Sequence, residues 1–344
     1  MSKILDQDAQ YIFENLENEL LQLKDCTVLI SGATGFFGKN ILHFLLFLNE
    51  SKQQNIKLLL LTRNKKTFLQ RYPEFNHKAC TYLEGSIHNF QIPNENIDYV
   101  IHAAGETANL AQTNEIEILD TAYNGTKTVL EMAKNKNVKS FLYISSGAIY
   151  GEQPNDLTRI SETYPGASDL SQLKTCYSEA KRVAEYLCQF YGQKFDVPVK
   201  IARCFAFVGP YMPLDSSFAC GNFINNALQK QSIVIRSDGK STRSYLYTAD
   251  LVIWLIKCLI IGKKLTPYNI GADQEISILQ LAKEVSKNFE HTVNIEFAAK
   301  TESKNSRYIP NNKKAFNDLD IKSYFSFEKS IQRTVEYYKN EQQQ

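Results

Sequence analysis

Residues 27–48, TVLISGATGFFGKNILHFLLFL, decide the fold of this chain. A run of β-branched and leucine residues ends at Ser31 and predicts a buried strand, and the residues from Lys39 onward predict a helix. The glycines between them are spaced Gly-x-x-Gly-x-x-Gly, which suits a sharp turn that approaches a pyrophosphate at a helix N-terminus. A tight βα turn without a ligand is the alternative that glycines alone leave open. The residues predicted to form a dinucleotide-binding turn are Gly32, Thr34, Gly35, Phe36, Phe37 and Gly38.

The same alternation of strand and helix continues outward from this turn. Short apolar runs alternate with longer helical stretches, which predicts a parallel sheet covered by helices on both faces. The predicted strands are Thr27–Ser31, Ile56–Leu61, Cys80–Leu83, Tyr99–Ala103, Phe141–Ser145 and Val197–Arg203. The predicted helices of this part are Lys39–Asn49, Ile116–Lys134 and Ser178–Tyr191, and an N-terminal helix is indicated by Ile12, Leu16, Leu20 and Leu23.

After Pro210 the pattern becomes mixed, with predicted helices at Asn222–Lys230, Leu251–Ile261, Ile278–Phe289 and Phe327–Tyr338. The predicted fold class is therefore α/β, a Rossmann-like doubly wound parallel sheet with a smaller mixed α/β C-terminal substrate-binding domain. We place the dinucleotide-binding domain, preceded by the N-terminal helix, at residues 1–205 and the second domain at 206–344. Part of residues 242–272 is expected to return to the first domain.

Composition excludes several classes of function. The 39 basic and 37 acidic residues leave a net charge of +2. A charge this close to balance does not indicate binding to nucleic acid or to an anionic membrane. Seven dispersed cysteines without a Cys-x-x-Cys pair indicate reduced thiols, so we expect a cytoplasmic protein. The five histidines form no metal-ligand pattern, and no metal is expected.

The choice of coenzyme depends on the end of the second strand. NAD enzymes usually carry an acidic residue there, but this chain has Thr62, Arg63 and Asn64. Arg63 is able to pair with a 2′-phosphate, although a solvated arginine or one stacked on adenine is the alternative. We therefore expect NADP to be preferred over NAD.

Two further stretches supply acid–base chemistry. Tyr177 and Lys181 are four residues apart at the start of a predicted helix and share one face. A nearby ammonium favours the phenolate, which prepares Tyr177 for proton transfer. Ser146 closes a preceding strand, at the sheet edge where parallel sheets bind ligands. These three side chains are the candidate catalytic residues.

With these stretches, the sequence resembles the extended short-chain dehydrogenases/reductases that modify nucleotide-sugars. The resemblance runs from Thr27 to about Tyr338 and is specific for the family, but much less so for the reaction. It is carried by GATGFFG (32–38), VIHAAG (100–105), SSGAIYG (145–151), YSEAKRVAE (177–185), RCFAFVGP (203–210), GNFI (221–224) and STRSYLYTADL (241–251).

The resemblance implies roles for further residues. Cofactor binding extends to Ser86, Ile87, Ala103, Ala104, Gly105 and Cys204, and to Tyr177 and Lys181. Substrate binding falls to Ser146, Asn222, Arg243 and Arg307, the last three toward the phosphates of a nucleotide-diphosphate sugar. Helix capping by Asn222 and solvation of the two arginines are the structural alternatives. Relatives usually dimerise through two long helices that match Ile116–Lys134 and Ser178–Tyr191, so a homodimer is expected.

The departures from the family pattern narrow the reaction. Dehydratases carry an Asp-Glu pair after the serine or threonine, and decarboxylases a glutamate, but here Gly147 and Ala148 cannot transfer a proton. Ala122 and Ala206 replace asparagines that are common in relatives. The acids or thiols that would have to compensate are Glu106, Glu152, Glu162 and Cys204.

The remaining trio suffices for hydride transfer at C4 of the sugar. We favour a 4-ketoreductase, with a redox-neutral 4-epimerase as the close alternative and a decarboxylase or dehydratase behind it. A non-catalytic, nicotinamide-sensing scaffold is the alternative from another class; it predicts erosion of the Ser/Tyr/Lys set, and all three residues are present.

Overall fold

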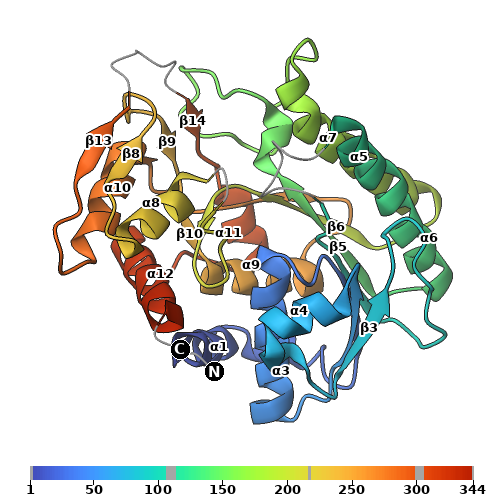
Figure 1. Ribbon diagram of the computed structural model, residues 1–344. Helices are drawn as coiled ribbons and strands as arrows, with labels where there is room; N and C mark the ends of the chain where they lie inside the picture. Colours follow the sequence, from blue (N-terminus) through green and yellow to red (C-terminus); the bar gives the residue numbers. More distant parts are fainter. Residues whose placement is uncertain (1–2, 106–113, 216–217, 299–305, 343–344) are drawn as a thin grey trace.

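A seven-stranded sheet forms the centre of the molecule (Figure 1). The computed structural model describes residues 3–105, 114–215, 218–298 and 306–342. All neighbouring strands of this sheet run parallel, in the order β11-β6-β5-β4-β1-β2-β3. The predicted Rossmann-like doubly wound fold is confirmed. The strands are β1 (Thr27–Ser31), β2 (Lys57–Thr62), β3 (Cys80–Glu84), β4 (Tyr99–His102), β5 (Ser140–Ser146), β6 (Val199–Cys204) and β11 (Pro267–Ile270).

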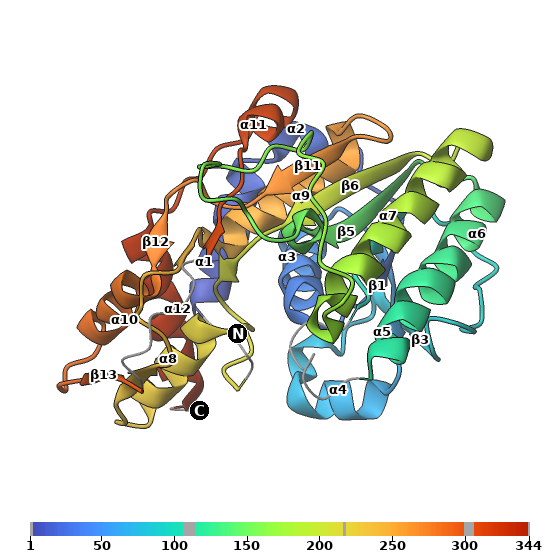
Figure 2. The ribbon, with the colours of Figure 1, turned by 90° about the horizontal axis from the view of Figure 1, so that it is seen from above.

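Helices cover both faces of the sheet because its central strands are buried on both sides (Figure 2). One face packs against α3 (Phe36–Lys52) and α9 (Thr248–Ile261), with α1 (Lys3–Glu14) and α2 (Glu17–Leu20) beyond them. The other face packs against α6 (Thr126–Lys136) and α7 (Cys176–Lys194). The short α4 (Lys65–Arg71) follows β2 and leads into a 3-10 turn, Pro73–Phe75.

A second, smaller group of elements has its own apolar cluster. It contains α8 (Ala219–Leu228), α10 (Ile278–Lys287) and α12 (Phe327–Gln342), with β8 (Ile233–Ile235) paired to β13 (Ile295–Phe297). A small sheet is formed by β12 (Ile276–Ser277), β9 (Thr242–Arg243) and β14 (Arg307–Tyr308). The pair β7 (Phe207–Val208) and β10 (Leu246–Tyr247) connects this group to α9, and α11 (Lys313–Leu319) packs on β11.

The helix predicted over residues 116–134 is divided. It consists of α5 (Glu115–Asp120), a π-helical turn at Thr121–Gly125, and α6. A Cβ at Gly125 would lie 2.8 Å from the Ile87 side chain, so the turn brings the helix close to the loop after β3. Periodicity alone does not reveal such a turn, because the apolar positions continue on both sides of it.

The N-terminal prediction is also only partly right. The four apolar residues of the expected helix are fully buried, but the helix ends at Glu14 and the chain restarts in α2. Asp8 of α1 forms a buried ion pair with Arg333 of α12, in which Asp8 Oδ1 lies 2.6 Å from a guanidinium nitrogen. The Tyr247 hydroxyl donates to the other Asp8 oxygen at 2.7 Å. The described helices include none with the length and apolar character that crossing a membrane would require.

Candidate active site

The glycine-rich turn packs against the end of β4 at backbone contact distance. Gly32 has a φ of +76°, and a Cβ at this position would lie 2.6 Å from the carbonyl carbon of Ala103. A Cβ at Gly38 would lie 2.3 Å from the Gly32 carbonyl oxygen. Gly35 is the N-cap of α3 and offers no side chain to the first turn of that helix. A dinucleotide pyrophosphate fits this arrangement, because the backbone is accessible and the helix N-terminus favours negative charge.

The two phenylalanines of the turn are partly buried and contact the second part of the molecule. The ring of Phe37 meets Phe207 of β7 edge to face, with centroids 4.9 Å apart. Phe36 packs against the apolar clusters of both parts of the molecule. Thr34 is half-buried beside them. The turn therefore joins the sheet to the substrate-side elements.

The end of β2, where the coenzyme ribose is expected, carries mixed charge. Thr62 is buried, and the Asn64 side chain caps α4 by accepting from the Thr67 amide at 2.9 Å. Arg63 is exposed. Glu84, the register partner of Thr62 on β3, accepts from the Lys65 amide at 2.9 Å and places a carboxylate at the same edge.

The loops after β3 and β4 lie beside this edge. Ser86 accepts a hydrogen bond from the His88 amide at 3.3 Å, and Ile87 packs against the π-helical turn. A Cβ at Gly105 would lie 3.4 Å from the Lys181 ammonium, with Ala103 and Ala104 preceding it along the chain. The predicted dinucleotide-binding residues are thus adjacent to Lys181, a candidate catalytic residue.

The three candidate catalytic residues converge at the carboxyl ends of β5 and β6. Ser146 ends β5, and its hydroxyl interacts with the Tyr177 hydroxyl. Lys181, one turn further along α7, donates from its ammonium to the Ile144 carbonyl at 2.9 Å. Its ammonium lies 5.9 Å from the Tyr177 ring centroid. Tyr177 and Lys181 therefore lie on the same side of α7, as their spacing predicts.

Burial is the largest influence on both titrating groups. It raises the pKa of Tyr177 to about 12, against a lowering hydrogen bond from Ser146. It lowers the pKa of Lys181 to about 8, against the opposing charges of Cys204 and Glu185. The sequence predicts that Lys181 lowers the Tyr177 pKa, but the Tyr177 pKa is raised by burial, so Tyr177 is a neutral phenol and a hydrogen-bond donor at physiological pH.

A second tyrosine, which the sequence patterns did not identify, belongs to this group. The Tyr308 hydroxyl on β14 donates to the Cys204 carbonyl at 3.5 Å and also interacts with the Ser146 hydroxyl. Its ring packs on Phe205 with centroids 4.5 Å apart. Burial raises the pKa of the Cys204 thiol, so this thiol stays protonated at neutral pH and does not supply a thiolate base.

The predicted phosphate ligands are differently placed. Arg243 on β9 lies 5.8 Å from the Tyr308 ring centroid, and its guanidinium donates to Ser306. Arg307 pairs with Glu275 at 2.9 Å. Because side chains alternate along a strand, Arg307 faces away from the side that Tyr308 and Arg243 share. Asn222 is half-buried on α8.

Two of the candidate compensating acids, Glu152 and Glu162, lie in the described part of the chain. Glu162 accepts from the Asn269 amide at 2.9 Å, and Glu152 is exposed. Glu106 lies outside the described residues. Glu185, one turn beyond Lys181, forms an ion pair with Arg203 at 2.7 Å.

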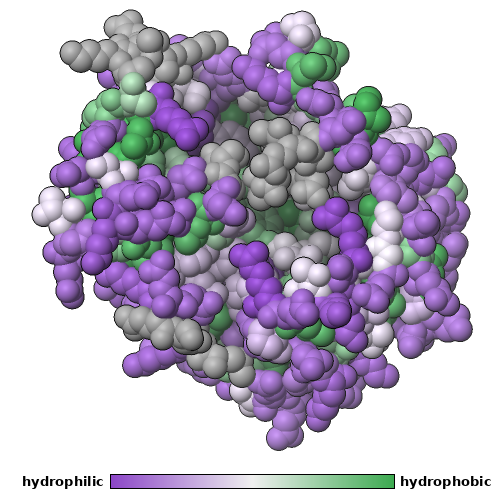
Figure 3. Space-filling view, viewed as in Figure 1, coloured by the Kyte–Doolittle hydropathy of each residue, from purple (hydrophilic) through white to green (hydrophobic). Residues whose placement is uncertain are grey.

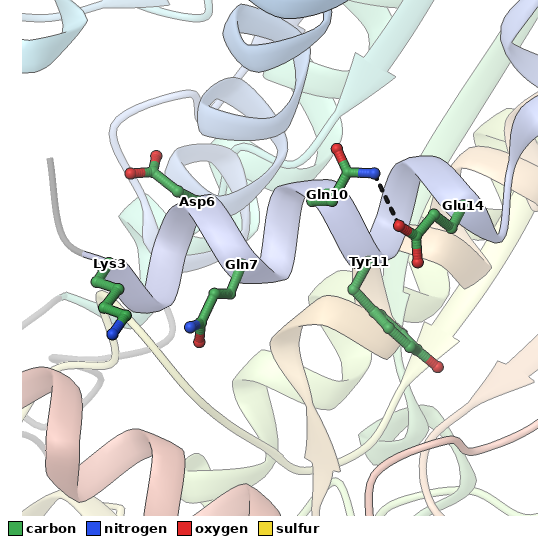
Figure 4. A pocket seen from close by; sticks show the side chains of 6 residues that line it. All are labelled: Lys3, Asp6, Gln7, Gln10, Tyr11 and Glu14. Atoms are coloured by element: carbon green, nitrogen blue, oxygen red, sulfur yellow. Dashed lines mark hydrogen bonds between the residues drawn. The ribbon is translucent and has the colours of Figure 1, made fainter.

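A hollow opens in the middle of the molecule between the two parts, with apolar residues in its depth and hydrophilic residues at its rim (Figure 3). A separate shallow depression runs along the outer face of α1 (Figure 4). All of its lining side chains come from that single helix and include none of the candidate site residues. Its lining consists of Lys3, Asp6, Gln7, Gln10, Tyr11 and Glu14.

The fold and site define a Rossmann-type enzyme that uses a nicotinamide dinucleotide. Residues 28–271 match the model of the NAD dependent epimerase/dehydratase family, and the chain belongs to this family. The predicted resemblance to extended short-chain dehydrogenases/reductases is therefore confirmed.

Individual relatives carry several activities. UDP-glucuronic acid decarboxylase 2 of Arabidopsis thaliana is 34% identical over 220 residues, which cover 64% of this chain and 48% of that protein. The chain spans only 48–64% of the length of the first three curated relatives. A solved epimerase from Methanothermobacter thermautotrophicus superposes with a TM-score of 0.81 at 21% identity, covering 96% of this chain and 97% of that one. The dTDP-glucose 4,6-dehydratase of Bacillus anthracis, solved with NAD, gives 0.78 at 23%, covering 92% and 98%.

We expect Gly38→Ala to weaken binding of the dinucleotide, because its Cβ would displace the Gly32 carbonyl from the turn. Backbone strain of about 1–3 kcal/mol corresponds to about 5- to 150-fold in the dissociation constant. Calorimetric titration with NAD and NADP measures this effect, and thermal unfolding of the free protein separates it from loss of the fold. An unchanged affinity for both coenzymes would show that the turn does not contact the pyrophosphate.

Proposed function

We propose that this protein transfers a hydride between a nicotinamide dinucleotide and C4 of a nucleotide-diphosphate sugar, with reduction of a 4-ketone as the net reaction. The observation that carries the proposal is the meeting of Ser146, Tyr177 and Lys181 at the strand ends beside Gly147 and Ala148. The set suffices for proton transfer at one sugar oxygen, and Gly147 and Ala148, the positions directly after Ser146, carry no acid for elimination or decarboxylation.

The protonation state of Tyr177 supports reduction. A phenol with a raised pKa holds its proton, which a ketone oxygen needs as its carbon becomes an alcohol. Ser146 orients that oxygen, and Lys181 holds the nicotinamide ribose and stabilises the phenolate that remains. When bound, the dinucleotide supplies the hydride chemistry.

The alternatives differ in what they require of these residues. A 4-epimerase needs the same trio but must first remove a proton from the C4 hydroxyl, which a neutral Tyr177 does less readily. A decarboxylase, the activity of the relative above, needs an acid where Ala148 stands. A non-catalytic scaffold gives no reason for the three side chains to converge.

The direct experiment incubates the protein with 4-keto-6-deoxy nucleotide-sugars and one equivalent of NADPH or NADH. One-for-one consumption of coenzyme with a reduced sugar supports the 4-ketoreductase. Conversion of a nucleotide-sugar without net coenzyme loss would replace it with an epimerase or another redox-neutral reaction, which the mass of the product identifies.

We expect Tyr177→Phe to lower turnover by about 100-fold or more, because the proton donor is lost while the ring is kept. Coenzyme affinity and thermal unfolding should remain close to those of the unmodified protein. Single-turnover oxidation of NAD(P)H measures the effect. Near-normal turnover in Tyr177→Phe would exclude this residue as the acid.

We propose that NADP(H) is the preferred coenzyme. Thr62 adds no negative charge at the end of β2, and the exposed Arg63 places a guanidinium, the group that pairs best with a phosphate, next to it. The Glu84 carboxylate at the same edge opposes this preference.

Two substitutions measure these opposing charges. Arg63→Ala should weaken NADPH binding about tenfold relative to NADH, and Glu84→Gln should shift the ratio the other way. Lys57→Ala, at the exposed opposite end of β2, is the matched control. Equal or tighter binding of NADH by the unmodified protein would overturn the preference.

We also propose a homodimer. An apolar face covers α5 and α7, two helices in contact, where Ile116 is 70% and Tyr186 is 74% exposed. Leu119 and Tyr123 continue this face on one helix segment, and Val183 and Phe190 on the other, at helical spacing. Such a face suits a second copy related by two-fold symmetry.

Tyr186→Asp should convert the dimer to a monomer, because it places a charge in the centre of the apolar face. Sedimentation velocity measures the mass in solution. Leu21→Asp is the control, since Leu21 is 73% exposed on the opposite side of the sheet. A monomeric unmodified protein would remove the proposal.

The seven cysteines are unpaired in the structure, which supports a reducing, cytoplasmic compartment. We place the reaction among those that build activated sugars for surface polysaccharides.

A further inference from the structure

The Tyr308 hydroxyl lies near Ser146, at the ends of β5 and β6. Ser146 and Cys204 are register partners at the ends of β5 and β6, and the Tyr308 hydroxyl is 3.5 Å from the Cys204 carbonyl. A Cβ at Gly147 would lie 2.7 Å from the same hydroxyl. The phenol therefore occupies the space that a side chain after Ser146 would fill.

We propose that the Tyr308 hydroxyl extends the Tyr177–Ser146 pair into a line of three hydroxyls and sets the direction in which Ser146 offers its proton. In this role Tyr308 is a positioning residue, because it acts on the Tyr177 hydroxyl through Ser146. The inference rests on the proposed hydride transfer and adds a residue that the family motifs above do not contain.

Counting donors and acceptors leads to this role. A serine hydroxyl has one proton and two lone pairs, and the Ala148 amide takes one lone pair of Ser146 at 3.1 Å. One proton and one lone pair remain for two tyrosines, so one tyrosine must donate and the other must accept. With the Tyr308 proton on the Cys204 carbonyl, Tyr177 donates to Ser146 and Ser146 donates to Tyr308.

This order reverses when Tyr177 gives its proton to the sugar oxygen. The O–H bond of Tyr177 breaks, the C4 oxygen gains the proton, and Ser146 then donates to the phenolate while Tyr308 donates to Ser146. No other proton is gained or lost, and the long bond to Cys204 is the one given up. Hydrogen bonds to a charged oxygen are the stronger ones, so this arrangement stabilises the phenolate.

The described groups around this line come from several elements. Tyr177 faces Lys181 on its own helix, Tyr143 and Ser146 on β5, and Cys204 on β6. Tyr308 faces Cys204 and, from β9, Arg243. Lys181 and Arg243 are the cations of this set, and Tyr308→Phe removes neither.

The test is Tyr308→Phe, which keeps the ring packed on Phe205 and removes only the hydroxyl. Ionisation of Tyr177 is measured by tyrosinate absorbance in the complex with oxidised coenzyme and no sugar. The signal of Tyr177 is the difference between the titration curve of the protein and that of its Tyr177→Phe variant. We expect the Tyr177 pKa to rise by about 0.5–1 unit and kcat to fall about 3- to 10-fold with little change in KM. Tyr164→Phe is the matched control, since Tyr164 packs in the same apolar cluster as Tyr308.

A second variant, Gly147→Ala, pushes the hydroxyl away from Ser146 and should raise the same pKa. Identical titrations for Tyr308→Phe, Tyr164→Phe and the unmodified protein would reduce Tyr308 to a packing residue. Because the titration uses no sugar, its outcome does not depend on the proposed reduction. Absence of C4 chemistry in the unmodified protein would overturn the proposed function. The effect of Tyr308 on the Tyr177 pKa would still be measured in that case.

Discussion

The contact between Gly32 and the backbone of Ala103 determines how the rest of the site is assembled. It leaves no space for a side chain and requires β1 and β4 to end at the same level. Gly38 then packs on the Gly32 carbonyl, so α3 begins directly at the turn. Two residues beyond Ala103, Gly105 meets the Lys181 ammonium. A steric condition on one glycine thereby brings the predicted coenzyme-binding turn close to α7, which carries two of the candidate catalytic residues.

Side chains alternate at the end of β5, so Ser145 and Ser146 point to opposite sides of the strand and have different partners. Ser145 turns toward α7 and hydrogen-bonds Glu185, while its neighbour Ser146 turns toward the two tyrosines. Glu185 is held by Arg203 of β6, and the partly buried pair fixes α7 against the sheet. Such a pair adds little net stability but is costly to break, because one charge would be left buried. Because Tyr177 and Lys181 are on the same helix, this ion pair also fixes their positions.

Sequence predicted the elements whose determinants are local. Glycine spacing identified the turn, apolar runs identified the first six strands of the sheet within one or two residues, and the Tyr-x-x-x-Lys spacing identified the α7 face. The π-helical turn was missed because apolar periodicity continues through it. The break after Glu14 was missed because the apolar residues on both sides are buried in the same core.

Tyr308 could not be found from spacing. Its position depends on the pairing of β14 with β9 and on the absence of a side chain at Gly147, far away in the chain. The one available signal was Gly147 itself, which we interpreted as a missing acid rather than as space for another group. Likewise, the pairing of Arg307 with Glu275 depends on the register of the small sheet, which a single sequence does not specify.

The ion pair between Asp8 and Arg333 joins α1, the first helix of the chain, to α12, the last one. The two helices lie next to each other in the structure (Figure 1). During synthesis, α1 leaves the ribosome more than 300 residues before its partner. Asp8 must then remain solvated, or paired elsewhere, until α12 appears. Closure of the molecule is therefore a late, long-range event, and the face of α10 on which α12 packs stays exposed until then.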